Sequence, residues 1–90
     1  MTVERISRIR AAIEQNLAPL ELDIKDDSAR HAGHAGAREG GHFQVRVVSE
    51  AFRGKNAIQR HRLVFAAVDS LMRTDIHALN IDARTPEEVS

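Results

Sequence analysis

The order of apolar and polar residues in the first part of the chain predicts a helix followed by a strand. Between residues 3 and 17, apolar side chains recur three and four positions apart, as on the buried side of an amphipathic helix; they are Val3, Ile6, Ile9, Ile13 and Leu17. Pro19 is expected to end this helix. Leu20, Leu22 and Ile24 then alternate with polar residues, which is the pattern of a half-buried strand.

The pattern of the second half predicts a strand, a helix, another strand and the start of a last helix. Strand character runs over residues 42–49, and a turn is expected around Gly54. Asn56, with Gln59 three residues later, is a plausible helix N-cap. The side chains expected on the buried face of that helix are Ile58, Phe65, Val68, Leu71 and Met72. Residues 76–83 form a third predicted strand, and Thr85 with Pro86 predicts a further helix start.

Residues 28–41 follow neither period. This segment reads SARHAGHAGAREGG and holds four of the five glycines. A connection of this length without periodicity is uncommon inside a compact domain and is usually functional or disordered. We therefore expect a flexible loop rich in histidine and glycine.

The predicted order is helix, strand, strand, helix, strand, helix. The first two strands are expected to pair antiparallel, whereas the third follows a helical crossover, which favours a parallel, right-handed connection. The sequence thus predicts a single α+β domain over residues 1–90, with a three-stranded mixed sheet and helices on one face.

Composition narrows the function classes. The 13 basic and 13 acidic residues cancel, so the net charge offers no general attraction to nucleic acid or membrane. There is no cysteine, hence no thiol nucleophile or thiolate metal site. No run approaches the roughly 18 apolar residues of a membrane span, and a cytoplasmic location is the default expectation. A chain of 90 residues buries a modest core and carries no recognisable catalytic motif, so a binding protein is favoured over an enzyme.

Four of the five histidines are expected at one end of the sheet. His31, His34 and His42 belong to the long loop or the strand after it, and His77 opens the parallel third strand at the same end. Neutral imidazole binds zinc, copper, iron and nickel, so this rim is a candidate metal site open to ligands from a second molecule. The alternative is a solvated loop with exposed rim residues.

A second cluster surrounds the start of the predicted second helix. Its cations are Arg53, Lys55, Arg60 and Arg62. Such a patch suits phosphate or an acidic partner surface, while the plainer alternative is a solvated helix start. His61, inside this cluster, is expected to lean on the edge of the core rather than bind a ligand.

The stretch from His42 to Glu88 closely resembles the BolA family. The elements that carry the resemblance occur in order with matching spacing: His42-Phe43, Val47-Val48-Ser49, Phe52 with Gly54, Arg60-His61-Arg62-Leu63-Val64, Ile76-His77-Ala78-Leu79 and Thr85-Pro86. The resemblance implies a fold similar to class II KH domains, which agrees with the predicted order of elements.

The resemblance also implies a function. BolA-like proteins form heterodimers with monothiol glutaredoxins and share with them a [2Fe-2S] cluster that also has glutathione as a ligand, in iron regulation or cluster trafficking. The matching ligand here is His77, with His31 from the loop as the second ligand and His34 as a close alternative. The isolated protein is then expected to be a monomer or weak dimer without a tightly bound cofactor.

Two other functions stay open at this stage. A nucleic-acid-binding regulator would use the basic cluster, although a KH domain needs a GxxG loop where this chain has Gly54-Lys55-Asn56-Ala57. A simple histidine site for zinc or nickel would bind metal without glutaredoxin or glutathione.

Overall fold

The computed structural model describes residues 2–27, 41–72 and 74–89. Residues 28–40 of the expected flexible loop, with the two candidate ligands His31 and His34, lie outside these residues, and its last residue, Gly41, begins strand β2. Helix α1 spans Thr2–Leu17, strand β1 Glu21–Asp26, strand β2 Gly41–Val48, helix α2 Ala57–Ala67, strand β3 Ile76–Arg84 and helix α3 Pro86–Val89. Short 3-10 helices, η3 at Glu50–Phe52 and η4 at Asp69–Leu71, flank α2. The predicted order of elements is confirmed.

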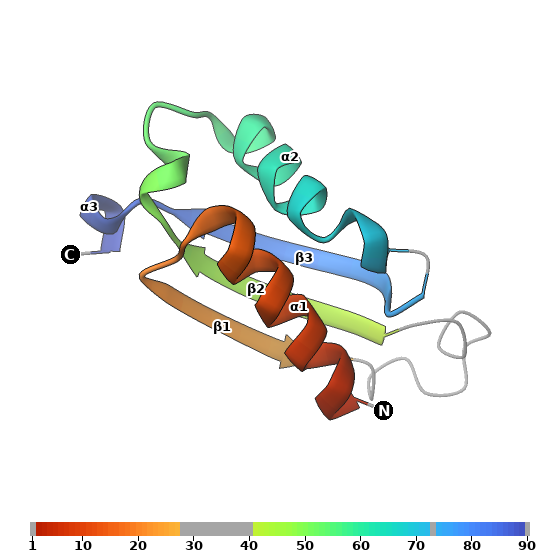
Figure 1. Ribbon diagram of the computed structural model, residues 1–90. Helices are drawn as coiled ribbons and strands as arrows, with labels where there is room; N and C mark the ends of the chain where they lie inside the picture. The colour runs from red at the N-terminus through yellow and green to blue at the C-terminus, as the bar shows by residue number, and fades with distance from the viewer. Residues whose placement is uncertain (1, 28–40, 73, 90) are drawn as a thin grey trace.

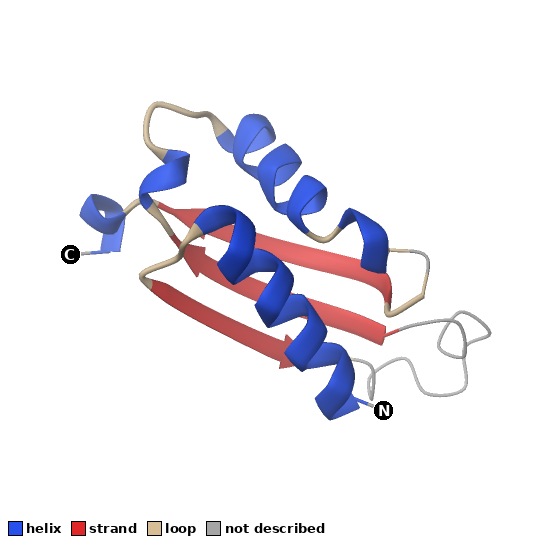
Figure 2. Ribbon diagram, viewed as in Figure 1, coloured by secondary structure: helices blue, strands red, loops and turns tan. Residues whose placement is uncertain are grey.

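The three strands form one mixed sheet in the order β1-β2-β3. Strands β1 and β2 pair antiparallel, and β2 pairs parallel with β3. Helices α1 and α2 lie side by side on one face of the sheet, as Figures 1 and 2 show. The expected α+β architecture, with helices covering one face, is therefore confirmed.

The core lies between these two helices and the sheet. Alternate residues of β2 point into it, with Phe43, Val45 and Val47 at most 2% exposed. Ile9 and Ile13 of α1 and Val64 of α2 are fully buried against them. Because β2 is the central strand, its inward side chains meet both helices and hold the two layers together.

Ser49 joins helix α1 to the end of β2. Its buried hydroxyl donates a hydrogen bond of 2.6 Å to the carbonyl of Leu17 and accepts one from the amide of Ala51. The hydroxyl both donates to and accepts from the backbone, so the role of Ser49 is to hold the end of α1 against the end of β2.

The predicted buried face of the second helix is partly wrong. Ile58 is 64% exposed and Phe65 38% exposed, while Val64 and Val68 are fully buried. Regular α-helix also ends at Ala67 instead of continuing to Met72, because the backbone tightens into η4. Leu71 and Met72 consequently sit only partly buried at the margin of the core.

Two apolar residues at the ends of other elements also differ from expectation. Val3, in the first turn of α1, is 75% exposed, and Leu20, just before β1, is 65% exposed. Both continue a buried pattern in the sequence, but Val3 lies in the first turn of its helix and Leu20 outside the strand, which begins at Glu21. No helix in the described part of the chain is long and apolar enough to cross a membrane.

Candidate functional site

His42 and His77 meet at one end of the sheet. Their ring centroids are 5.1 Å apart, with the ring planes inclined at 49°. His77 is exposed and His42 half-buried. These two histidines are 35 positions apart in the sequence, and their expected convergence is confirmed.

A break in the strand register brings the two rings together. Gly41 pairs with Ile76, but His42 pairs with Ala78, so β3 has one extra residue, His77, at this point. If the register of His42 to Val48 continued, His77 would pair with Gly41 and point to the face opposite His42, since neighbouring residues alternate. An extra residue of this kind re-aims a side chain, and here it turns His77 toward His42.

The spacing of the two rings suits a shared metal ion. With metal–nitrogen bonds of about 2.0–2.1 Å and tetrahedral angles, two imidazoles on one metal have ring centres roughly 5 Å apart. The observed 5.1 Å agrees with this value. Across residues 2–27, 41–72 and 74–89, however, no group of three or more His, Asp or Glu side chains is arranged to hold a metal ion. The two imidazoles could therefore supply at most two of the four ligands of a tetrahedral metal site, and the described residues do not supply a third.

A partly buried ion pair fixes the backbone beside the histidines. Asp75 is 8% exposed and accepts hydrogen bonds from the Nε and Nη2 atoms of Arg8 at 3.0 and 2.5 Å. The hydrogen bond from Arg8 holds the pKa of Asp75 below its ordinary value. The Asp75 carbonyl also accepts a bond of 3.1 Å from the amide of Gly41. Helix α1, the start of β2 and the start of β3 are thus tied together next to the rim.

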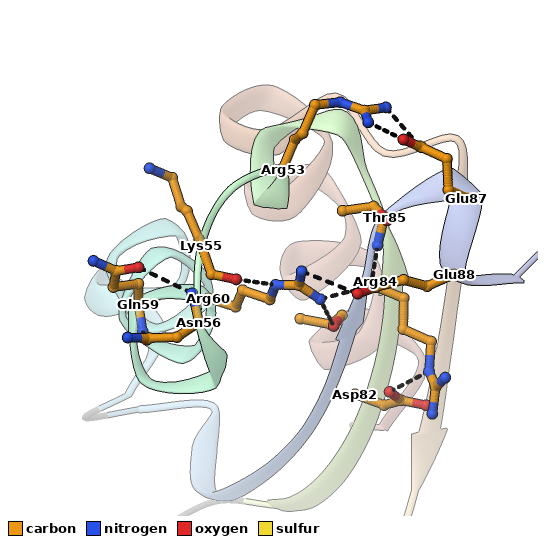
Figure 3. Close-up of polar contacts among 11 residues, drawn as sticks. Arg53, Lys55, Asn56, Gln59, Arg60, Asp82, Arg84, Thr85, Glu87 and Glu88 are labelled. Carbon is orange, nitrogen blue, oxygen red and sulfur yellow. Dashed lines mark hydrogen bonds and ion pairs between the residues drawn. The ribbon is translucent and has the colours of Figure 1, made fainter.

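Helix α3 neutralises two of the four cations of the basic cluster. Arg53 pairs with Glu87, and the guanidinium of Arg60 donates a bond of 2.7 Å to Glu88, as Figure 3 shows. Arg53 also pairs with Glu50. Hydrogen bonds from Arg60 and from the amide of Thr85 lower the pKa of Glu88 to about 2. Two of the four cations predicted to bind a partner therefore already have carboxylate partners within the chain.

Arg60 is also part of the scaffold. Its guanidinium donates to the carbonyls of Lys55 and Ala83 at 2.9 and 3.1 Å. Lys55 and Arg62 differ from it, since their side chains are exposed and make no ion pair within the described residues. The cluster therefore offers two available cations rather than four.

His61 does not lean on the core, contrary to the sequence-based expectation. It is exposed on the flank of α2 that also carries Phe65. Both side chains line an open groove of about 410 Å³ whose other wall includes Leu79 and Ile81 of β3. The sequence pattern placed Phe65 in the core and His61 beside it. Because Phe65 is exposed and His61 lies on the same side of the helix, His61 is exposed as well.

Comparison with known proteins gives a consistent family match. A family model described as BolA-like protein matches residues 13–88. The chain is 43% identical over 88 residues to SufE-like protein 1, chloroplastic/mitochondrial, of Arabidopsis thaliana, in a match covering 91% of this chain and 24% of that protein. It is 44% identical over 80 residues to BolA-like protein 1 of Mus musculus, covering 89% and 57% of the two chains.

A solved structure shows the same fold. The BolA domain of SufE1 from Arabidopsis thaliana superposes with a TM-score of 0.81 at 45% identity, covering 91% of this chain and 92% of that one.

The matches to curated relatives span 24% and 57% of their lengths, so those proteins contain further sequence. The first relative's name places it in chloroplasts and mitochondria, and the cytoplasmic location expected for this chain stays a prediction, as does the likeness to class II KH domains.

Proposed function

The chain belongs to the BolA-like protein family, and on that basis we propose that it is a non-enzymatic partner of a monothiol glutaredoxin. The two proteins form a heterodimer around a [2Fe-2S] cluster, with glutathione as a further ligand, for cluster trafficking or iron regulation. This chain contributes His77 and a second histidine, His31 or His34, from the segment before β2. Its histidines provide nitrogen ligands, and the thiolates come from the partner and from glutathione.

The observation that carries this proposal is the His42–His77 pair at the exposed end of the sheet. Its position suits a ligand set completed from outside, because the side chain of His77 is accessible to a partner. The segment that holds His31 and His34 is attached at the same place. Its flanking residues are Asp27 and Gly41, and the amide of Asp27 donates a bond of 2.6 Å to the carbonyl of His42.

The chain's own residues fit the group they would hold. Neutral imidazole is a known ligand of iron in [2Fe-2S] centres, where replacing thiolate by histidine raises the reduction potential. Asp75 and Arg8 keep the backbone of both histidine-bearing strands in place, which preserves the spacing of the rings. His42 stands within reach of the same site, as an alternative nitrogen ligand or as a neighbour that orients His77.

Anaerobic reconstitution tests the proposal. The protein is mixed with a monothiol glutaredoxin, glutathione, iron and sulfide, and visible absorption and circular dichroism are recorded together with the mass of the complex. We expect a heterodimer whose spectrum differs from that of the glutaredoxin homodimer and reverts to it with His77→Ala. His61→Ala is the matched control, since His61 is an exposed histidine on α2. A spectrum identical to the homodimer's for the unmodified chain would reject the proposal.

Two variants decide between the candidate second ligands. His31→Ala and His34→Ala are reconstituted separately, and the variant whose spectrum moves toward that of His77→Ala identifies the ligand. If neither variant changes the spectrum and His42→Ala does, the second nitrogen comes from His42.

The nucleic-acid alternative has weaker support. Arg53 and Arg60 are occupied by Glu87 and Glu88, which leaves Lys55 and Arg62 as the available cations of the cluster. Binding that falls steeply with salt and is unaffected by His77→Ala would favour it. The simple zinc or nickel site makes a different prediction, namely tight metal binding by the isolated chain without glutaredoxin or glutathione.

A further inference from the structure

Strand β3 lies at an edge of the sheet, since no other strand in the described part of the chain pairs with its outer side. The direction of its backbone groups follows from two hydrogen bonds. The carbonyl of Arg84 points toward β2, where it accepts from the amide of Ser49. The carbonyl of Ala83 points outward, where it accepts from Arg60. Because backbone groups alternate along a strand, those of Leu79 and Ile81 also point outward.

This outward edge forms one wall of the groove of about 410 Å³ described above. The opposite wall is the flank of α2 that carries His61 and Phe65, four positions apart. The Phe65 side chain is 38% exposed there. The side chains of Leu79 and Ile81, on the wall formed by β3, are half-buried. A row of outward backbone groups thus runs beside an exposed apolar surface.

We propose that this groove binds an extended peptide segment of a partner protein, which adds to the sheet as a fourth strand beside β3. The backbone of the peptide pairs with the outward groups of Leu79 and Ile81. Its alternate side chains are aliphatic and pack against Phe65. An acidic residue near one end of the segment faces Lys55, which lies at the Ala83 end of the edge and makes no ion pair within the described residues. The groove adjoins the histidine rim, since His42 also lines it, but strand addition at the edge of β3 uses backbone groups and goes beyond the proposed cluster function.

A second copy of this chain does not fit the same edge. Pairing of β3 with β3 of another copy would place the two strands about 4.8 Å apart. In an antiparallel pair both copies carry their helices on the same face of the joined sheet, and because α2 packs against β3, the two copies of α2 would compete for the same space. Packed helices need about 8–10 Å between their axes. An added strand without its own covering helix avoids this clash.

A nucleic acid is also a poorer occupant. Asp82 and Glu88 line a neighbouring hollow at the Ala83 end of the strand, and Arg60, the arginine there, is already paired with Glu88. The groove beside Leu79 and Ile81 contains no lysine or arginine among its lining residues and offers backbone donors and acceptors, which match another extended backbone better than a phosphate chain.

Nuclear magnetic resonance with ¹⁵N-labelled protein tests the proposal. The probe is a short, capped synthetic peptide in which valine alternates with threonine and glutamate, added to about 1 mM. We expect the amide protons of Leu79 and Ile81 to shift and to exchange more slowly with solvent. The amides of Asn80 and Asp82, which point toward β2, should keep their exchange rates. A peptide with its valine amides N-methylated should not bind, because it lacks the donors.

Two variants locate the contact. Phe65→Glu should weaken peptide binding at least about tenfold, because it places a charge in the apolar wall. Leu20→Glu is the matched control, since Leu20 is 65% exposed before the opposite edge strand, and it should leave binding unchanged. Both residues are exposed, so both variants should fold, which their amide spectra would verify.

Four outcomes would overturn the proposal. They are no shifts at the highest peptide concentration, equal binding of the N-methylated peptide, equal weakening by Leu20→Glu, and tighter binding of single-stranded oligodeoxythymidine than of the peptide in the same groove. The last result would assign the groove to nucleic acid.

Discussion

At the scale of single residues, Asp75 is the charge on which the geometry of the rim depends. It is 8% exposed, accepts two hydrogen bonds from Arg8 and lies two positions before His77. Sequence alone did not indicate this role, because the pair joins residues 67 positions apart and neither residue belongs to a recognisable motif. Only the packing of α1 beside the start of β3 brings the two side chains together.

Asp75→Asn should therefore destabilise the protein. The substitution removes a charge-assisted pair with partly buried geometry, and we expect a loss of about 1–3 kcal/mol in the free energy of unfolding, measured by urea denaturation. Asp23→Asn is the control, since Asp23 is exposed on β1, and it should change stability by less than about 0.5 kcal/mol. Equal effects of the two substitutions would show that the Arg8–Asp75 pair does not stabilise the fold.

Glu88 should contribute to stability in a pH-dependent way. Its pKa in the folded chain is about 2, below its ordinary value of 4.5, chiefly because Arg60 donates a hydrogen bond to it. A lowered pKa means that the contribution is fully present above about pH 4.5 and is lost as the pH falls toward about 2. Thermal unfolding of Glu88→Gln should lack this part of the acid destabilisation.

The control for Glu88→Gln is Glu14→Gln, because Glu14 is exposed on α1 and makes no ion pair within the described residues. Its acid profile should match that of the unmodified protein. The Glu88 effect should also shrink at high salt, since the Arg60–Glu88 pair is partly exposed. A Glu88→Gln profile that follows the unmodified protein at all pH values would contradict the assignment.

At the scale of elements, caps and breaks could be read from the sequence more reliably than buried faces. Asn56 and Gln59 form the predicted capping box, with both hydrogen bonds at 2.9 Å. The buried face of α2 was harder to identify, because residues 63–68 are all apolar and periodicity cannot select one side. The 3-10 turn after Ala67 then shifts the phase of the following residues. The extra residue at His77 left no signal in the sequence.

The cap of α2 gives a direct prediction. Asn56→Ala should cost about 1 kcal/mol in the free energy of unfolding, because it removes the side chain that accepts from the amide of Gln59. Asn56→Gly is the control and should cost only a few tenths of a kcal/mol. Chemical denaturation measures both, and equal losses would mean that the cap is not what Asn56 contributes.

The assignment of the buried face of α2 is tested by neighbouring substitutions. Val64→Ala should destabilise the protein by about 2 kcal/mol, because Val64 is fully buried among core side chains. Phe65→Ala should cost less than about 1 kcal/mol although it removes a larger side chain, since Phe65 is 38% exposed. If Phe65→Ala destabilised the protein more than Val64→Ala, Phe65 would belong to the buried face of α2, as the sequence pattern predicted.

At the scale of the whole molecule, the sequence was sufficient for topology and for part of the site. The two strand periods and the helical crossover predicted the mixed sheet, and the parallel pairing of β2 with β3 correctly placed His42 and His77 at one end. The ion pairs between helix α3 and the basic cluster were not predicted, because Glu87 and Arg53 are 34 positions apart. Charge counts along the chain cannot show that such groups neutralise one another.

The central claim is that a histidine of this chain binds the shared cluster, and pulsed electron paramagnetic resonance tests it most directly. The chain is produced with ¹⁵N-labelled histidine, reconstituted with unlabelled glutaredoxin and glutathione, and reduced by one electron. We predict a nitrogen hyperfine coupling that changes from the ¹⁴N to the ¹⁵N pattern on labelling and disappears with His77→Ala. A nitrogen pattern that labelling leaves unchanged would contradict the claim and assign all cluster ligands to the partner and glutathione.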